Sequence, residues 1–302
     1  MVAATTEAAR LLLHSGADPR ADEGETGRWL ALSAVSVSDS LPALLDLLLQ
    51  RGWNVDARQR DGQTVLTQAA KNDHAELVRL LLKAGADVNQ RCECSGIYGG
   101  NHTPLTLATV SSDSSDSGER TMQLLLDAGA RVDDASADGT PLVQAARRGS
   151  LPRVRLLLTR GADPRRARDA DGDTALMHAV KAARDGEMLQ ALMAAGADAN
   201  APGGGGATAL MWAAAFDYGQ VAALLLDAGA RIEQASQIGR TALMMAAMSG
   251  SVEAARLLVL RGARTDPVDR DGRSALALAE SRLNGDALLR MRSVLTQPKE
   301  LR

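Results

Sequence analysis

Two cysteines and a histidine lie close together in one short segment, Gln90–His102, which reads QRCECSGIYGGNH. Cys92, Cys94 and His102 could supply three ligands to a zinc ion. A fourth ligand is missing, however, and short zinc sites usually have C-x-x-C rather than C-x-C spacing. The two thiols could instead form a reversible disulfide, although a ring closed over so few residues is strained. We interpret the segment as a plain loop with two free thiols, and we expect no metal and no cofactor.

The side chains that could do acid–base chemistry are scattered along the chain. The four histidines, His14, His74, His102 and His178, are separated by many residues. No carboxylate pair, nucleophile motif or metal-binding motif has a recognisable spacing. The sequence therefore predicts that the protein is not an enzyme.

Large aromatic side chains are rare, and half of them gather in one place. The chain has six aromatic residues, and Trp212, Phe216 and Tyr218 fall within seven residues of one another. Trp212 and Phe216 are four residues apart, so they share one face of a helix. Arg147 and Arg148 stand together at the end of an earlier apolar segment. Aromatic and arginine side chains carry much of the binding energy in protein interfaces, so both groups indicate a protein-binding surface.

The elements that must position these residues are short paired helices, and Asp61–Asn89 is the clearest example. Thr64 is an expected N-cap, followed by a helix that breaks at Asn72 and Asp73. A second apolar helix follows over 75–83 and ends before Gly85, because a left-handed residue at a helix end is easiest without a Cβ. Neither helix can bury its apolar face alone, so the unit needs neighbours.

The chain supplies those neighbours as internal repeats. The helix-ending glycines are spaced by 36, 33, 44, 32, 35, 33 and 33 residues: Gly16, Gly52, Gly85, Gly129, Gly161, Gly196, Gly229 and Gly262. A turn followed by a T-P-L or T-A-L helix start recurs with nearly the same period: His102–Ala108, Gly139–Ala146, Gly172–Val180, Gly206–Ala214 and Gly239–Ala247. A period near 33 residues is typical of a solenoid of stacked repeats.

These motifs resemble the ankyrin repeat, and the resemblance covers nearly all of residues 1–295. It implies an all-α repeat solenoid of about eight to nine stacked helix-turn-helix repeats with β-hairpin fingers. We expect one such solenoid over residues 1–302. Residues 1–20 would form a partial first repeat, residues 271–295 a C-terminal capping repeat, and residues 296–302 a tail.

The resemblance also implies which positions line the concave groove of the stack. The two positions after a paired Ala145 and Ala146 would face this groove. His178, Trp212 and Met245 occupy one equivalent position in three successive repeats and would stack side by side along it. We therefore predict a partner-binding site of seven residues: Arg147, Arg148, His178, Lys181, Trp212, Phe216 and Met245. Its expected ligand is a protein segment that is acidic at one end and apolar at the other. The alternative function is a small-ligand, metal or redox sensor that uses the Cys92, Cys94 and His102 segment.

Composition limits the remaining classes. The net charge is −3, which gives no electrostatic case for binding nucleic acid. No apolar run approaches the roughly 20 residues of a membrane span, so we expect no membrane partner. We expect a monomer in the cytoplasm. The alternative is a periplasmic or secreted protein, if a signal peptide preceded residue 2.

Overall fold

The computed structural model describes residues 41–58, 62–93, 100–111, 116–182 and 186–297. These residues form fifteen α-helices and one 3₁₀ turn, η1 (Gly204–Gly206), and they contain no β-strand. The predicted all-α repeat fold is confirmed. The expected hairpin fingers appear as loops closed by single antiparallel bridges, which join Cys92 to His102, Ser136 to Gly139, Arg168 to Thr174 and Val268 to Ser274.

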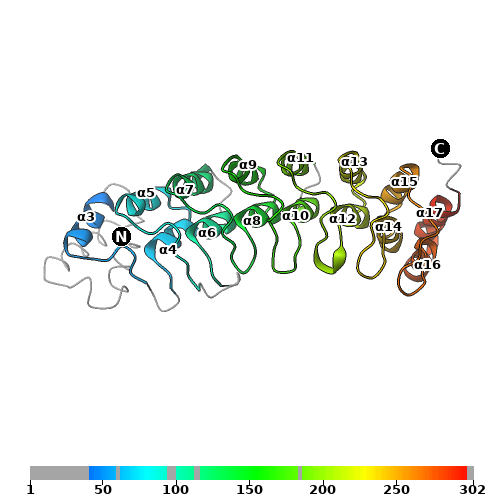
Figure 1. Cartoon of the computed structure of the whole chain (residues 1–302), viewed down its shortest axis with the longest axis horizontal. Coiled ribbons are helices and arrows are strands. Elements are labelled where there is room, and N and C mark those ends of the chain that lie inside the picture. Colours follow the sequence, from blue (N-terminus) through cyan, green and yellow to red (C-terminus); the bar gives the residue numbers. More distant parts are fainter. Residues whose placement is uncertain (1–40, 59–61, 94–99, 112–115, 183–185, 298–302) are drawn as a thin grey trace. The chain divides into compact units, whose positions relative to one another are not determined.

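The helices come in pairs, one pair to a repeat (Figure 1). The first helices are α4 (Val65–Lys71), α6 (Pro104–Val110), α8 (Pro141–Arg147), α10 (Ala175–Ala182), α12 (Ala209–Ala215), α14 (Ala242–Ser249) and α16 (Ala275–Arg282). The second helices are α3 (Leu41–Gln50), α5 (Ala75–Lys83), α7 (Asp116–Asp127), α9 (Leu151–Thr159), α11 (Glu187–Ala194), α13 (Gly219–Asp227), α15 (Val252–Leu260) and α17 (Gly285–Thr296). The first helices α4, α10, α12 and α14 each pack on the second helix of their own repeat and on the next first helix. None of the described helices has the length and apolar character needed to cross a bilayer.

The chain divides into two compact units, and the boundary falls within α8. The first unit comprises residues 1–144 and 159–161, and the second comprises residues 145–158 and 162–302. The second unit therefore holds all seven residues of the predicted groove. The partial first repeat expected over residues 1–20 lies outside the described residues, and so does the end of the tail, 298–302. That the whole chain is one solenoid stays a prediction.

Threonine and serine caps explain where the first helices begin. The Thr64 side chain accepts a hydrogen bond from the backbone N–H of Thr67, while the Thr67 hydroxyl oxygen accepts one from the N–H of Thr64. This reciprocal pair satisfies two of the donors that a helix start leaves without partners. Thr208 and Thr241 cap α12 and α14 with their side chains in the same position. The predicted N-cap at Thr64 is confirmed.

Small and unbranched residues fill the space between the repeats. Met177, Met211 and Met244 occupy the same position in three successive first helices, and each is at most 1% exposed. All three side chains belong to the buried core of the stack. Because they hold the first helices together, the neighbouring positions on the same helices are left to face outward, and the candidate site lies at those positions.

Candidate functional site

Lys181 and three aromatic side chains form a continuous stack in the second unit, which we call the α10–α12 cluster. Lys181 comes from α10, Trp212 from α12, and Phe216 and Tyr218 from the turn that follows α12. The Lys181 ammonium lies 4.0 Å from the centroid of the Trp212 ring. The Trp212 and Phe216 ring centroids are 5.8 Å apart with the planes 20° from parallel, and those of Phe216 and Tyr218 are 5.6 Å apart.

Exposure decreases from Phe216 to Trp212. Phe216 is 43% exposed, whereas Trp212 is half-buried. The Trp212 indole nitrogen is buried and has no hydrogen-bond acceptor among the described residues. An ammonium over a tryptophan face contributes about 0.5–2 kcal/mol, depending on how far it is desolvated. Lys181 therefore stabilises the observed orientation of Trp212, and Phe216 extends the aromatic surface toward solvent.

The basic side chains of the predicted site are balanced by two aspartates that the sequence interpretation missed. Asp169 Oδ2 lies 3.0 Å from an Arg147 guanidinium nitrogen and 2.7 Å from His178 Nε2. Asp173 Oδ2 accepts a hydrogen bond of 2.7 Å from Lys181 Nζ. These two carboxylates largely compensate the positive charge expected of Arg147 and Lys181. Both aspartates belong to the finger that precedes α10.

Asp173 also ties the cluster to the next repeat. Its Oδ1 accepts a hydrogen bond of 3.0 Å from the backbone N–H of Gly204 in η1, 31 residues away. The Asp173 side chain is 11% exposed and the Lys181 side chain is 29% exposed, so the pair is partly desolvated. This carboxylate therefore positions Lys181 over Trp212 and joins two neighbouring fingers.

Burial and hydrogen bonding shift the pKa values of the pair around Asp169 in the same direction. Burial lowers the pKa of His178 from its ordinary value of 6.5, against the hydrogen bond to Asp169, which acts to raise it. Burial acts to raise the pKa of Asp169, but the hydrogen bond to His178 and the backbone N–H of Asp173 hold it below its usual range. His178 is consequently neutral at neutral pH and Asp169 is charged.

These shifts predict a loss of stability on acidification. Because the pKa of His178 is lower in the folded protein, the unfolded chain binds a proton first as the pH falls below about 6.5. Stability present above that pH is then lost, and we expect the free energy of unfolding to fall from about pH 7.5 to about pH 5.5. The fall should be smaller for His178→Gln.

The control for this measurement is His74→Gln, because burial also lowers the pKa of His74. That variant should retain the part of the pH dependence that belongs to His178. Denaturant unfolding at several pH values measures both variants. An identical fall in wild type and His178→Gln would contradict the assignment.

The other predicted residues lie on or directly after the first helices α8 and α14. Arg147 ends α8, and Arg148 follows it on an exposed surface. Met245 is half-buried on α14, a helix that packs directly against α12. The structure thus joins Lys181, Trp212 and Phe216 in one contact network and links Arg147 with His178 through Asp169. Tyr218, Asp169 and Asp173 belong to these networks as well.

The cysteine segment differs from its predicted form. Cys92 is disulfide-bonded, so the expectation of a free thiol is wrong at this position. The chain's other cysteine, Cys94, lies outside the described residues. Two backbone hydrogen bonds of 2.9 Å join Cys92 to His102, and both residues are buried. The finger therefore closes on itself at Cys92, which the spacing of the cysteines did not indicate.

The disulfide of Cys92 also argues against a zinc site in this segment. Zinc binds a thiolate, and the Cys92 sulfur is bonded to another sulfur. Within the described ranges, no three His, Cys, Asp or Glu side chains lie close enough together to hold a metal ion.

Comparisons with known proteins agree with the repeat architecture. The family model described as Ankyrin repeats (3 copies) matches residues 1–92, 32–136, 112–203, 165–236 and 210–290. The B-cell lymphoma 3 protein homolog of Mus musculus is 34% identical over 171 residues, which is 56% of this chain and 36% of that protein. Ankyrin repeat and SOCS box protein 16 of Homo sapiens is 33% identical over 214 residues, 65% of this chain and 44% of that protein. The chain spans less than half the length of these curated relatives.

Proposed function

Because the chain belongs to the ankyrin-repeat family, whose repeats generally bind protein partners, we propose that it is a non-enzymatic scaffold that holds a partner protein in its concave groove. The observation that carries this proposal is the α10–α12 cluster, in which an exposed Phe216 continues a stack fixed by Lys181 and Trp212. Ankyrin-repeat proteins are typically not enzymes.

The geometry of the cluster suits a binding anchor. Large apolar side chains that remain exposed on a soluble protein mark interaction sites when they form a connected surface. Phe216 is one of five large hydrophobic residues exposed in the described part of the chain, and it contacts two further rings. Rigid aromatic groups lose little conformational entropy on binding, so their buried area converts efficiently into affinity.

The fingers extend the proposed surface. Ile238 is 50% exposed and Val268 is 55% exposed, and they belong to successive fingers. The backbone N–H of Arg270 donates a hydrogen bond of 3.0 Å to the carbonyl oxygen of Ile238, which joins these two fingers. A partner that covers Phe216 could therefore rest on apolar finger residues held at a fixed spacing.

The ligand that we propose is the one expected from the sequence, a protein segment with an acidic end and an apolar end. The Arg147 side chain is 38% exposed although one guanidinium nitrogen contacts Asp169, and Arg148 beside it is exposed. A carboxylate from the partner can still approach these two residues, while an apolar side chain packs on Phe216. We assign steering of the partner to Arg147 and Arg148, because both side chains remain exposed to solvent.

A matched pair of variants tests the proposal. Phe216 and Leu260 are both 43% exposed, but Leu260 lies at the end of the second helix α15. We expect Phe216→Asp to lose the protein that wild type enriches from a native extract, and Leu260→Asp to retain it. Quantitative mass spectrometry after affinity purification measures both. Equal retention by the two variants would reject the groove as the binding surface.

The state of Cys92 bears on the cellular compartment of the protein. Disulfides persist mainly in oxidising compartments, so the bonded Cys92 supports the periplasmic or secreted alternative over the cytoplasm. We propose an oxidising compartment and a monomeric protein there. Fractionation of the native host, with thiols trapped at lysis, would contradict this if it recovered the protein reduced in the cytoplasm.

A further inference from the structure

Arg147 and His178 share one carboxylate oxygen in the second unit. Asp169 Oδ2 lies 3.0 Å from an Arg147 guanidinium nitrogen and 2.7 Å from His178 Nε2. The other oxygen, Oδ1, accepts hydrogen bonds from the backbone N–H groups of Asp171 and Asp173, at 3.0 and 2.9 Å. The Asp169 side chain is 5% exposed, whereas that of Arg147 is 38% exposed. A buried carboxylate thus connects a histidine to an arginine that solvent, or a partner, can reach.

Positive charge surrounds His178 together with this carboxylate. Lys181 comes from the same helix, Arg147 ends α8, and Asp169 and Asp173 come from the finger before α10. Asp173 holds the Lys181 ammonium at 2.7 Å. Burial is the main cause that lowers the pKa of His178, and the charges of Arg147 and Lys181 lower it further against the effect of Asp169. Repulsion from two cations therefore helps to keep His178 neutral.

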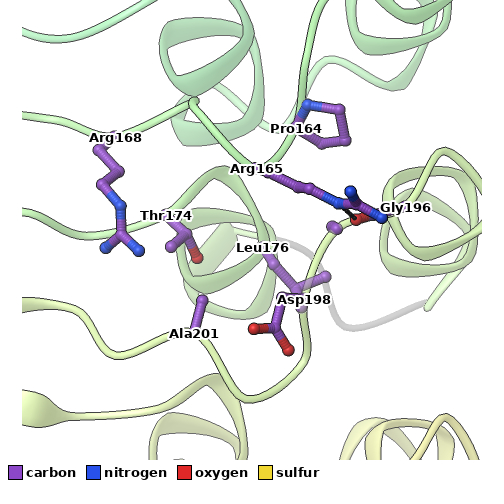
Figure 2. A pocket seen from close by; sticks show the side chains of 9 residues that line it. Pro164, Arg165, Arg168, Thr174, Leu176, Gly196, Asp198 and Ala201 are labelled. Carbon is purple, nitrogen blue, oxygen red and sulfur yellow. Dashed lines mark hydrogen bonds between the residues drawn. The ribbon is translucent and has the colours of Figure 1, made fainter.

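The other elements next to α10 add little charge at His178. Helix α12 packs on α10 and has no titratable residue, and Glu187 of α11 pairs with Arg155 at 3.4 Å. Arg168 belongs to the same finger as Asp169, but it lines a separate cavity of about 520 Å³ and donates hydrogen bonds to two backbone carbonyl oxygens (Figure 2). The protonation of His178 consequently depends on Asp169, Arg147 and Lys181.

An acidic segment of the partner would change this balance. Its carboxylate would pair with Arg147 from the solvent side, where the guanidinium remains exposed. The added negative charge offsets the repulsion between Arg147 and a protonated His178, so the imidazolium is more stable in the complex than in the free protein. Binding of the partner and binding of the proton then strengthen each other, because such coupling is reciprocal.

We propose that the partner binds more tightly as the pH falls below neutrality, because His178 takes up a proton when the acidic end of the partner covers Arg147. This inference rests on the proposed function and adds a regulation of the same groove. The sign follows from linkage: the complex binds more protons than the free protein, so affinity increases on acidification. The increase is complete below the pKa of His178 in the free protein, which lies under 6.5.

The affinity at about pH 7.5, 6.5 and 5.5 tests the proposal. The ligand is the purified protein that wild type enriches from a native extract. We expect Kd to decrease by about threefold or more between the first and last of these pH values, since half a pKa unit corresponds to that change. His178→Gln should lose this pH dependence, because glutamine can still donate to Asp169 but does not titrate.

Three variants separate the proposed network from general charge effects. His74→Gln removes a histidine of the first unit whose pKa is also lowered by burial, and it should keep the wild-type pH dependence. Arg148→Gln should weaken binding at every pH but retain the ratio of the affinities, because the contacts of Asp169 with Arg147 and His178 remain. Arg147→Gln should reduce that ratio.

Nuclear magnetic resonance follows His178 directly, with a glutamate pentapeptide as the probe for the acidic end. The imidazole signals are titrated from about pH 5 to about pH 8 with and without an excess of the peptide. We expect the peptide to raise the pKa of His178 and to leave that of His74 unchanged. Arg147→Gln should abolish the rise, since the carboxylates then have no guanidinium at this position.

Three results would overturn the proposal: equal partner affinity at the highest and lowest pH, the wild-type pH dependence in His178→Gln, or no effect of the peptide on His178. The proposed function survives these results if Phe216→Asp still loses the partner, whereas retention of the partner by Phe216→Asp rejects the groove itself. Circular dichroism at each pH shows whether a variant is folded. A variant that unfolds at the lowest pH is compared with wild type over the upper two values, where the same direction is expected.

Discussion

Trp212→Ala should weaken binding of the partner by about 2 kcal/mol or more, roughly a thirtyfold loss of affinity. The truncation removes the ring that Lys181 covers and on which Phe216 stacks. Phe216 would then lose its support as well as its neighbour, so the anchor would be lost as a unit. Calorimetry or surface-based binding with the purified partner measures the change.

The stability of the same variant decides between a binding residue and a core residue. Trp212 is half-buried, and its indole N–H is buried without an acceptor among the described residues. A buried donor without a partner costs about 1–3 kcal/mol, so its removal offsets part of the lost packing. We therefore expect only a small fall in melting temperature. A large fall with unchanged affinity per folded molecule would make Trp212 a core residue and remove the site.

Asp173→Ala should lower the free energy of unfolding by about 2–3 kcal/mol. Its carboxylate accepts hydrogen bonds from Lys181 Nζ and from the backbone N–H of Gly204, and hydrogen bonds to charged groups contribute about 1.5–3 kcal/mol each. Partial exposure of Lys181 reduces the total. The Lys181 ammonium would also lose its fixed position over Trp212, so we expect partner affinity to fall as well.

Asp171→Ala provides the comparison for this change. Asp171 is exposed in the same finger, two residues earlier in the chain. Its substitution by alanine removes the same charge as Asp173→Ala. Denaturant unfolding should leave its stability close to that of wild type. If Asp171→Ala and Asp173→Ala destabilise the protein equally, the effect belongs to net charge and not to the contacts with Lys181 and Gly204.

Most of the fold could be predicted from local signals in the sequence. Thr64 and Gly85 mark where helices begin and end, because caps and left-handed residues act within one turn of chain. The recurrence of this pattern then placed Lys181 and Trp212 on adjacent first helices. The structure brings these two side chains within 4.0 Å of each other, which a shared period can indicate without any knowledge of distant contacts.

The missed parts of the site depend on finger conformation. Asp173 contacts Gly204 across 31 residues, and Asp169 reaches His178 only because the finger folds back over α10. Neither contact follows from the helical period, since both aspartates lie outside the helices. The disulfide of Cys92 was weighed only as an alternative to free thiols, because the spacing of the cysteines does not show how that finger closes.

The central claim is that a partner protein contacts the α10–α12 cluster directly. Site-specific photo-cross-linking tests it with a photoreactive phenylalanine analogue at position 216 and, as the matched control, at position 260. Phe216 and Leu260 are equally exposed, at 43%. We expect a covalent adduct with the purified partner from position 216, none from position 260, and loss of the adduct when unmodified protein competes. An adduct from position 260 alone, or from neither position while the partner remains bound, would contradict the account.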